Sequence, residues 1–172
     1  MKQLTSSLIF LIFGCLACNS SSPAPTTIQI SGITSRNIFG VPSQVDADDW
    51  KIESDWPEFI IEKFDFADTL NYTTENDSPL VSDIMAYPNP CNSQVALQIT
   101  NTKPTIMKYI IVDSDIKLYQ QASVRLRSSN SSIILSIPSS TFTSGKLYRL
   151  YYAFYDKTKN IYAKGYGDLK IQ

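Results

Sequence analysis

Five carboxylates close together near residue 50 are the densest set of groups in this sequence that could do chemistry: Asp46, Asp48, Asp49, Glu53 and Asp55. Paired carboxylates can serve as general acid and base in a hydrolase, and acidic runs can bind calcium. The spacing singles out no pair, and the run lacks the glycine and glutamate register of an EF-hand loop. We therefore expect a hydrated acidic surface, no catalytic residue and no metal site, with a carboxylate-dependent hydrolase as the least favoured alternative.

Histidine is absent from all 172 residues, which excludes several kinds of catalysis. The chain cannot build a Ser-His-Asp or Cys-His site, and it cannot ligate zinc or haem through imidazole. It carries 15 basic and 16 acidic residues with no basic block, so the surface that nucleic-acid binding requires is missing. We expect no cofactor and no nucleic-acid partner.

Three large aromatic residues form a second candidate site, of a different kind. Trp50 and Trp56 flank part of the acidic run, and Tyr151 lies in a tyrosine-rich segment near the C-terminus. Together on an exposed flat face they would favour stacking against an extracellular polysaccharide. Buried, the same rings would be core anchors, which is the more frequent role of such side chains.

The first residues have the layout of a secretory signal peptide. Lys2 supplies a positive start, an apolar run covers residues 8–13, and small residues follow at Gly14 and Ala17. The apolar run is well short of the roughly 20 residues that a membrane-spanning helix needs. We expect this leader to direct export of the chain.

The two cysteines at the end of the leader determine what kind of leader it is. Cys15 and Cys18 have CxxC spacing, but neither a βαβ unit nor further ligands accompany them, which disfavours a redox or zinc pair. Both lie in stretches that resemble the lipobox of bacterial lipoproteins. Cys18 is favoured because a Ser/Pro/Thr spacer follows it directly, and Cys15 is the alternative. Acylation would anchor the chain, since each buried methylene contributes about 0.8 kcal/mol.

The rest of the chain is expected to be one all-β domain with an irregular beginning. Alternating or continuous apolar runs predict strands at 94–100, 106–112, 117–126, 132–137, 147–155 and 161–171. Residues 27–33 also alternate like a short strand, and 58–66 fits either a strand or one helical turn. Cys91 is expected to be a small buried hydrophobe.

Four parts follow in chain order. We expect a lipoprotein signal peptide over 1–17, a flexible tether over 18–27, an irregular section over 28–85 that packs on the main domain, and an antiparallel β-sandwich over 86–172.

A motif at the start of the last part resembles a known family. Tyr87-Pro88-Asn89-Pro90 and the strand that follows resemble the opening of the C-terminal sorting domains of type IX secretion cargo. The similarity covers about residues 84–172 and implies an immunoglobulin-like sandwich. Cys91 stands where that family has phenylalanine, and residues 164–171 differ from the lysine- and valine-rich tail of sorted cargo. A chain with its own lipid anchor is expected to keep this domain as a structural module.

These observations predict an exported, lipid-anchored envelope protein, placed at the outer membrane on its periplasmic or surface face. Its expected role is that of a non-catalytic structural or interaction module, with the membrane as one partner and an envelope protein or a polysaccharide as the other. The leading alternative is a polysaccharide-binding module built on Trp50, Trp56 and Tyr151.

Overall fold

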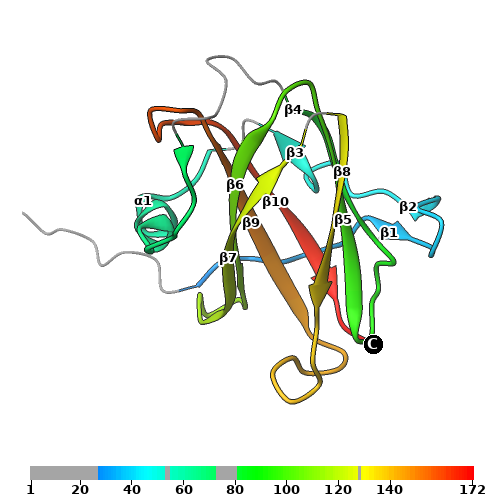
Figure 1. Ribbon diagram of the computed structural model, residues 1–172. Coiled ribbons are helices and arrows are strands. Elements are labelled where there is room, and N and C mark those ends of the chain that lie inside the picture. The colour runs from blue at the N-terminus through cyan, green and yellow to red at the C-terminus, as the bar shows by residue number, and fades with distance from the viewer. Residues whose placement is uncertain (1–26, 53–54, 73–80, 128) are drawn as a thin grey trace, which may run out of the picture.

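Antiparallel strands are the main regular structure in the chain that the computed structural model describes, namely residues 27–52, 55–72, 81–127 and 129–172 (Figure 1). The expected signal peptide, both candidate lipidation cysteines (Cys15 and Cys18), nearly all of the tether, and Glu53 lie outside these residues. The described part is mostly β with antiparallel sheets, as predicted, and it also contains one short helix.

Two sheets and a hairpin contain the strands. The five-stranded sheet has the order β3-β10-β9-β6-β7, the three-stranded sheet the order β4-β5-β8, and β1 pairs with β2. The bounds are β1 Ser35–Arg36, β2 Pro42–Gln44, β3 Lys51–Ile52, β4 Val81–Tyr87, β5 Gln94–Asn101, β6 Thr105–Val112, β7 Leu118–Leu126, β8 Ser129–Ser136, β9 Leu147–Tyr155 and β10 Ile161–Lys170.

The main core lies between the two sheets. Val95, Leu97 and Ile99 alternate along β5 and are fully buried, as their period of two predicts. They belong to one cluster with Leu150 and Tyr152, which lie on one face of β9. The two sheets therefore pack face to face, each covering the apolar side of the other.

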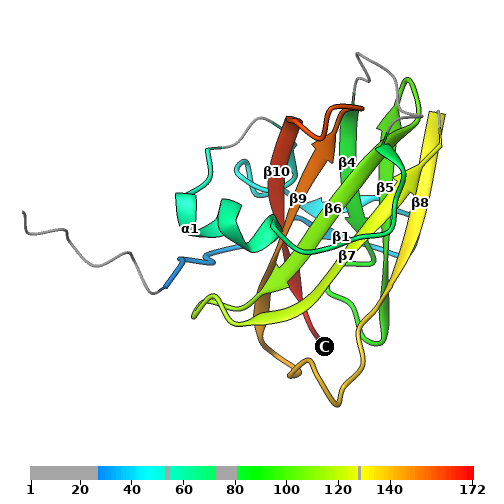
Figure 2. The ribbon, with the colours of Figure 1, turned by 60° about the vertical axis from the view of Figure 1, so that its left-hand side comes forward.

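A second core lies on the other face of the five-stranded sheet. Helix α1 (Glu58–Ile61) and the 3₁₀ turn η1 (Glu62–Phe64) cover it, and Figure 2 shows them on the side away from β4, β5 and β8. Trp56, Ile60 and Phe64 all belong to this core; Ile60 and Phe64, four residues apart, lie on one face of the helical segment, and Trp56 precedes it. Because β6 and β9 lie in the middle of the sheet, between the two cores, every residue of β6 is buried.

The structure corrects two expectations about the irregular section, the strand at 27–33 and the boundary at 86, and it decides between strand and helix at 58–66. Residues 27–33 contain no strand; Ile28 donates its N–H to the carbonyl of Ser114 instead. Residues 58–64 are helical rather than extended. The three-stranded sheet begins at Val81, five residues before the expected boundary at 86, and a register shift between Val81 and Asp83 interrupts the alternation that would have indicated this strand.

Candidate functional site

A buried polar network at the Tyr87-Pro88-Asn89-Pro90 motif joins segments that are far apart in the chain. Asn89 lies in the connection that joins β4 to β5, and it is fully buried. Its side-chain amide donates to the carbonyls of Thr34, at 3.1 Å, and Asp168, at 2.8 Å, and its side-chain oxygen accepts from the N–H of Lys170, at 3.0 Å. Its own backbone pairs with Arg36 in both directions. All hydrogen-bonding groups of Asn89 are thus used to hold neighbouring segments together.

Three further side chains, those of Asp49, Arg149 and Asp168, extend this network, and we call Thr34, Asp49, Asn89, Arg149 and Asp168 the Asn89 junction. The Arg149 guanidinium binds the Asp168 carboxylate through two hydrogen bonds of 2.7 Å, and it lies 4.0 Å from the ring centre of Tyr166. The Asp49 carboxylate accepts the N–H of Thr34, at 2.6 Å, and the N–H of Asp168. The junction therefore fixes the N-terminal segment and the end of β10 to the motif.

The acidic run serves structural contacts and the surface. Asp49 belongs to the Asn89 junction, Asp48 pairs with Lys51 at an exposed position, and Asp55 is exposed. In the described ranges, no three or more Cys, Asp or Glu side chains are close enough together to hold a metal ion. The run therefore divides between one half-buried carboxylate that holds the junction, Asp49, which the sequence did not distinguish, and the exposed carboxylates of Asp48 and Asp55.

We predict that the Asp49 carboxyl makes stability depend on pH. Burial raises the pKa of Asp49 to about 6, because lost hydration outweighs the two N–H groups that stabilise its charge. The stability that this group contributes is full below the unfolded pKa, about 4, and is lost as the pH rises through about 6. Urea unfolding of the parent and of Asp49→Asn should show the parent losing stability relative to the variant over that interval. A constant difference between the two would contradict the assignment.

Trp50, Trp56 and Tyr151 do not form an exposed platform. All three are buried, and Trp50 lies in a different core from Trp56 and Tyr151. Trp50 stacks on Tyr152 between the sheets, with ring centres 6.3 Å apart, while Trp56 meets Tyr151 edge-on at 5.3 Å beneath the helical segment. Stacking against a sugar needs an exposed ring face. The three residues are therefore core residues and not the ligand site that the sequence offered as an alternative.

Cys91 is buried in the main core, as its sequence context predicts. Burial raises the pKa of its thiol to about 11. At pH 8 only about one thiol in a thousand would then be ionised, and the thiolate is the reactive form.

We predict that iodoacetamide does not label Cys91 in the folded protein and labels it fully in urea. Rapid labelling of the folded chain would contradict a structural role.

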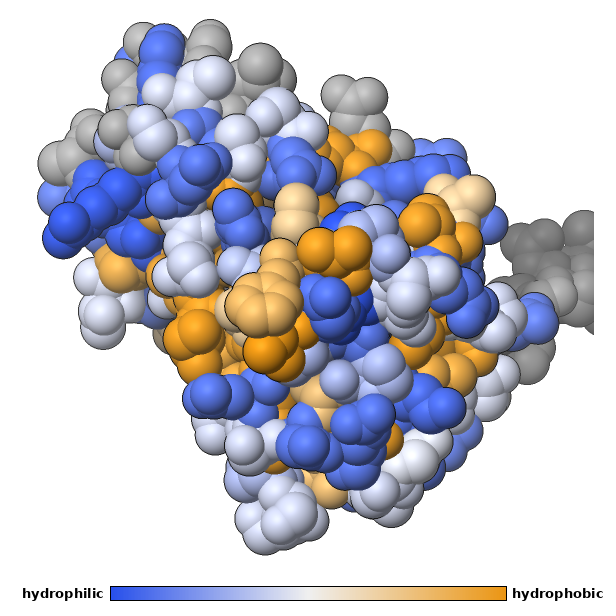
Figure 3. Space-filling view, turned by 90° about the vertical axis from the view of Figure 1, so that its right-hand side faces the viewer, coloured by the Kyte–Doolittle hydropathy of each residue, from blue (hydrophilic) through white to orange (hydrophobic). Residues whose placement is uncertain are grey.

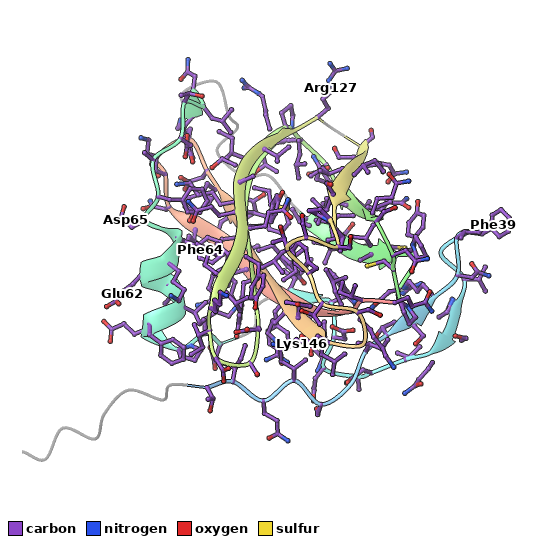
Figure 4. The ribbon with its side chains drawn as sticks, turned by 90° about the horizontal axis from the view of Figure 1, so that it is seen from below. Phe39, Glu62, Phe64, Asp65, Arg127 and Lys146 are labelled. Carbon is purple, nitrogen blue, oxygen red and sulfur yellow. The ribbon has the colours of Figure 1, made fainter. Side chains whose placement is uncertain are left out.

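A hollow of about 800 Å³ lies between the segment 61–72 and strands β6 and β9. At its base the Lys108 ammonium pairs with Asp68 at 3.0 Å and donates to the carbonyl of Phe66 at 2.9 Å. Burial disfavours the Asp68 charge, but hydrogen bonds from Tyr72 and Lys108 hold the pKa of Asp68 below its usual value. In Figure 4, Glu62 and Asp65 point outward from this segment.

Sequence reasoning missed Lys108, although one signal was present. A lysine in the middle of an otherwise apolar strand, 105–112, must either disrupt the core or find a buried partner. Here Asp68 and two backbone carbonyls satisfy it, so the lysine fixes the helical segment to the sheet. The base of the hollow is thereby fully engaged by the protein itself.

Two comparisons with known proteins find no match for this chain. No protein-family model matches the chain, and a search of curated proteins finds no match. Over the residues that the structure describes, no helix is long and apolar enough to cross a membrane.

Proposed function

We propose that the chain is an exported, lipid-anchored envelope protein that acts as a non-catalytic structural or interaction module. The proposal rests on what the residues that could bind a ligand or catalyse a reaction contact in the structure. Asp49, Cys91 and the three aromatic residues discussed above are engaged in internal packing and hydrogen bonding, in positions that hold the sandwich together. The proposed anchor rests on the leader and on the Ser/Pro/Thr spacer after Cys18.

The order of strands supports an immunoglobulin-like module. Such domains place strands A, B and E in one sheet and C, F and G in the other, with strand C′ added beside C in some of them. Here β4, β5 and β8 form one sheet, and β6, β7, β9 and β10 lie in the other with β6 between β7 and β9. If β4 corresponds to strand A, the remaining strands follow in the same order, with β7 as C′. We include this fold in the proposal.

The intact mass of the protein extracted from membranes tests the proposal. We expect the mass of residues 18–172 plus acyl chains, which would show both the anchor and a retained C-terminal domain. A Cys18→Ser variant should lose the acyl mass, and a Cys15→Ser variant should keep it. An unacylated parent chain, or one that ends near residue 85, would overturn the proposal.

A further inference from the structure

The hairpin of β1 and β2 carries an unusual concentration of exposed apolar side chains. Ile38 is 67% exposed, Phe39 81%, Val41 56% and Val45 68%. In the described part of the chain, the other exposed large hydrophobic residues are Ile61 and Leu118, which are less exposed, and Ile134, which lines a hollow together with Ile38. Figure 3 shows apolar surface on the side of the molecule where this hairpin lies, and Figure 4 shows Phe39 projecting away from the body.

Contacts within the hairpin hold this tip in place. The Arg36 guanidinium donates to the carbonyl of Gly40 at 2.8 Å, and the Asn37 side chain accepts the N–H of Phe39 at 2.9 Å. Gly40 has φ +77°, and a Cβ there would lie 3.5 Å from the Tyr87 ring, so the turn rests on β4. The backbone of Arg36 is paired with Asn89 of the junction. The apolar side chains are therefore presented on a fixed support.

Charge is distributed unevenly along the chain in a way that matches this surface. From residue 19 to residue 45 the sequence contains a single charged side chain, Arg36, whereas all 16 acidic residues lie at position 46 or later. A surface that meets lipid must avoid carboxylates, which lose hydration on contact with the acyl region. The segment that leads from the spacer to the hairpin meets this requirement.

The short stretch between the proposed anchor and the described residues keeps the domain close to a bilayer, and the described chain starts on the side of α1, away from the hairpin, so anchor and hairpin are widely separated (Figure 1). On the proposed function, Cys18 carries the acyl chains, and the nine residues 18–26 extend over about 30 Å at most. The domain is then held within about its own diameter of the membrane. A protruding tip with exposed aromatic and aliphatic side chains suits insertion at the interface between headgroups and acyl chains, where such side chains bury apolar surface.

We propose that the Ile38–Val41 tip of the hairpin inserts into the lipid surface that carries the chain's own anchor. This inference rests on the proposed function, and it makes the anchor and the hairpin two attachment points that orient the domain on the membrane. The contact depends on apolar burial rather than on charge, so it should be insensitive to salt.

Tryptophan substitution in the full mature lipoprotein tests the insertion. The protein is reconstituted into phosphatidylcholine vesicles with and without brominated acyl chains, which quench tryptophan at short range. Phe39→Trp should add emission that brominated lipid reduces at least twofold, equally at low and high salt. Arg127→Trp is the matched control: Arg127 is exposed and projects from a different side of the molecule in Figure 4, and its added emission should be unaffected. Trp50 and Trp56 are buried and give the same background in both variants.

The outcomes separate this inference from the proposed function. If the parent chain does not float with vesicles, the anchor fails, and the insertion fails with it. If the chain floats but Phe39→Trp is quenched no more than Arg127→Trp, the insertion alone is overturned. Protection of Phe39→Trp from aqueous iodide without quenching by brominated lipid would also overturn it, since the tip would then be covered by protein, such as a second copy of this chain.

Discussion

Replacing Asn89 with alanine is expected to lower the free energy of unfolding by about 3–5 kcal/mol. The substitution leaves two carbonyl oxygens and one N–H without partners in a fully buried site, and each such group costs about 1–3 kcal/mol. Asn89→Asp should be at least as damaging, because a carboxylate cannot donate to the carbonyls of Thr34 and Asp168. Urea unfolding followed by the emission of the buried Trp50 and Trp56 measures both variants.

Asn92, two residues after the motif, offers a matched control. It lies three positions after Asn89 and is exposed, so Asn92→Ala should change the free energy of unfolding by no more than about 0.5 kcal/mol. If Asn89→Ala were as mild as Asn92→Ala, the Asn89 junction would not contribute to the stability of the fold. The hydrogen bonds from Asn89 to neighbouring segments would then not explain the role of the motif.

The strands with the clearest alternation could be predicted from the sequence because burial imposes a period of two. Val95, Leu97 and Ile99 are all buried, and the continuous apolar run of β6 does lie between two cores. In β9 the period of two places Tyr148 and Leu150 in the main core and Tyr151 in the core beneath the helical segment. In each case a local pattern was sufficient because neighbouring strands bury one face or both.

The Asn89 junction could not be predicted, because its partners are far apart in the chain. Asn89 bonds to residues 55 and 79 positions away, and Asp49 meets Asp168 across 119 positions. No local pattern distinguishes Asp49 from Asp48, yet one carboxylate is in the junction and the other is in water. Composition likewise could not decide whether Trp50 and Trp56 face solvent, since the same rings suit a binding platform and a core.

Breaking the Arg149–Asp168 pair is expected to have the second large effect. Arg149→Met keeps most of the apolar stem but removes the guanidinium that lies over the Tyr166 ring, and it leaves the Asp168 carboxylate buried without its cation. Removing one partner of a buried pair costs about 3–5 kcal/mol. Burial already raises the pKa of Asp168, and Arg149 partly offsets this, so the variant should raise that pKa further. The folded variant then binds the proton more tightly than the unfolded chain, and its deficit relative to the parent should shrink as the pH falls.

Two further variants test whether the unpaired Asp168 carboxylate causes the loss of stability in Arg149→Met. The pair Lys51–Asp48 also has a short contact, 2.9 Å, but its side chains are 56% and 79% exposed, so Lys51→Met should cost less than about 1 kcal/mol. Asp168→Asn in the Arg149→Met background removes the charge and leaves the backbone carbonyl that Asn89 binds, so it should recover part of the stability. If the double variant were no more stable than Arg149→Met, lost packing would explain the effect. Recovery would instead show that Arg149 is required because the fold buries Asp168 to complete the junction.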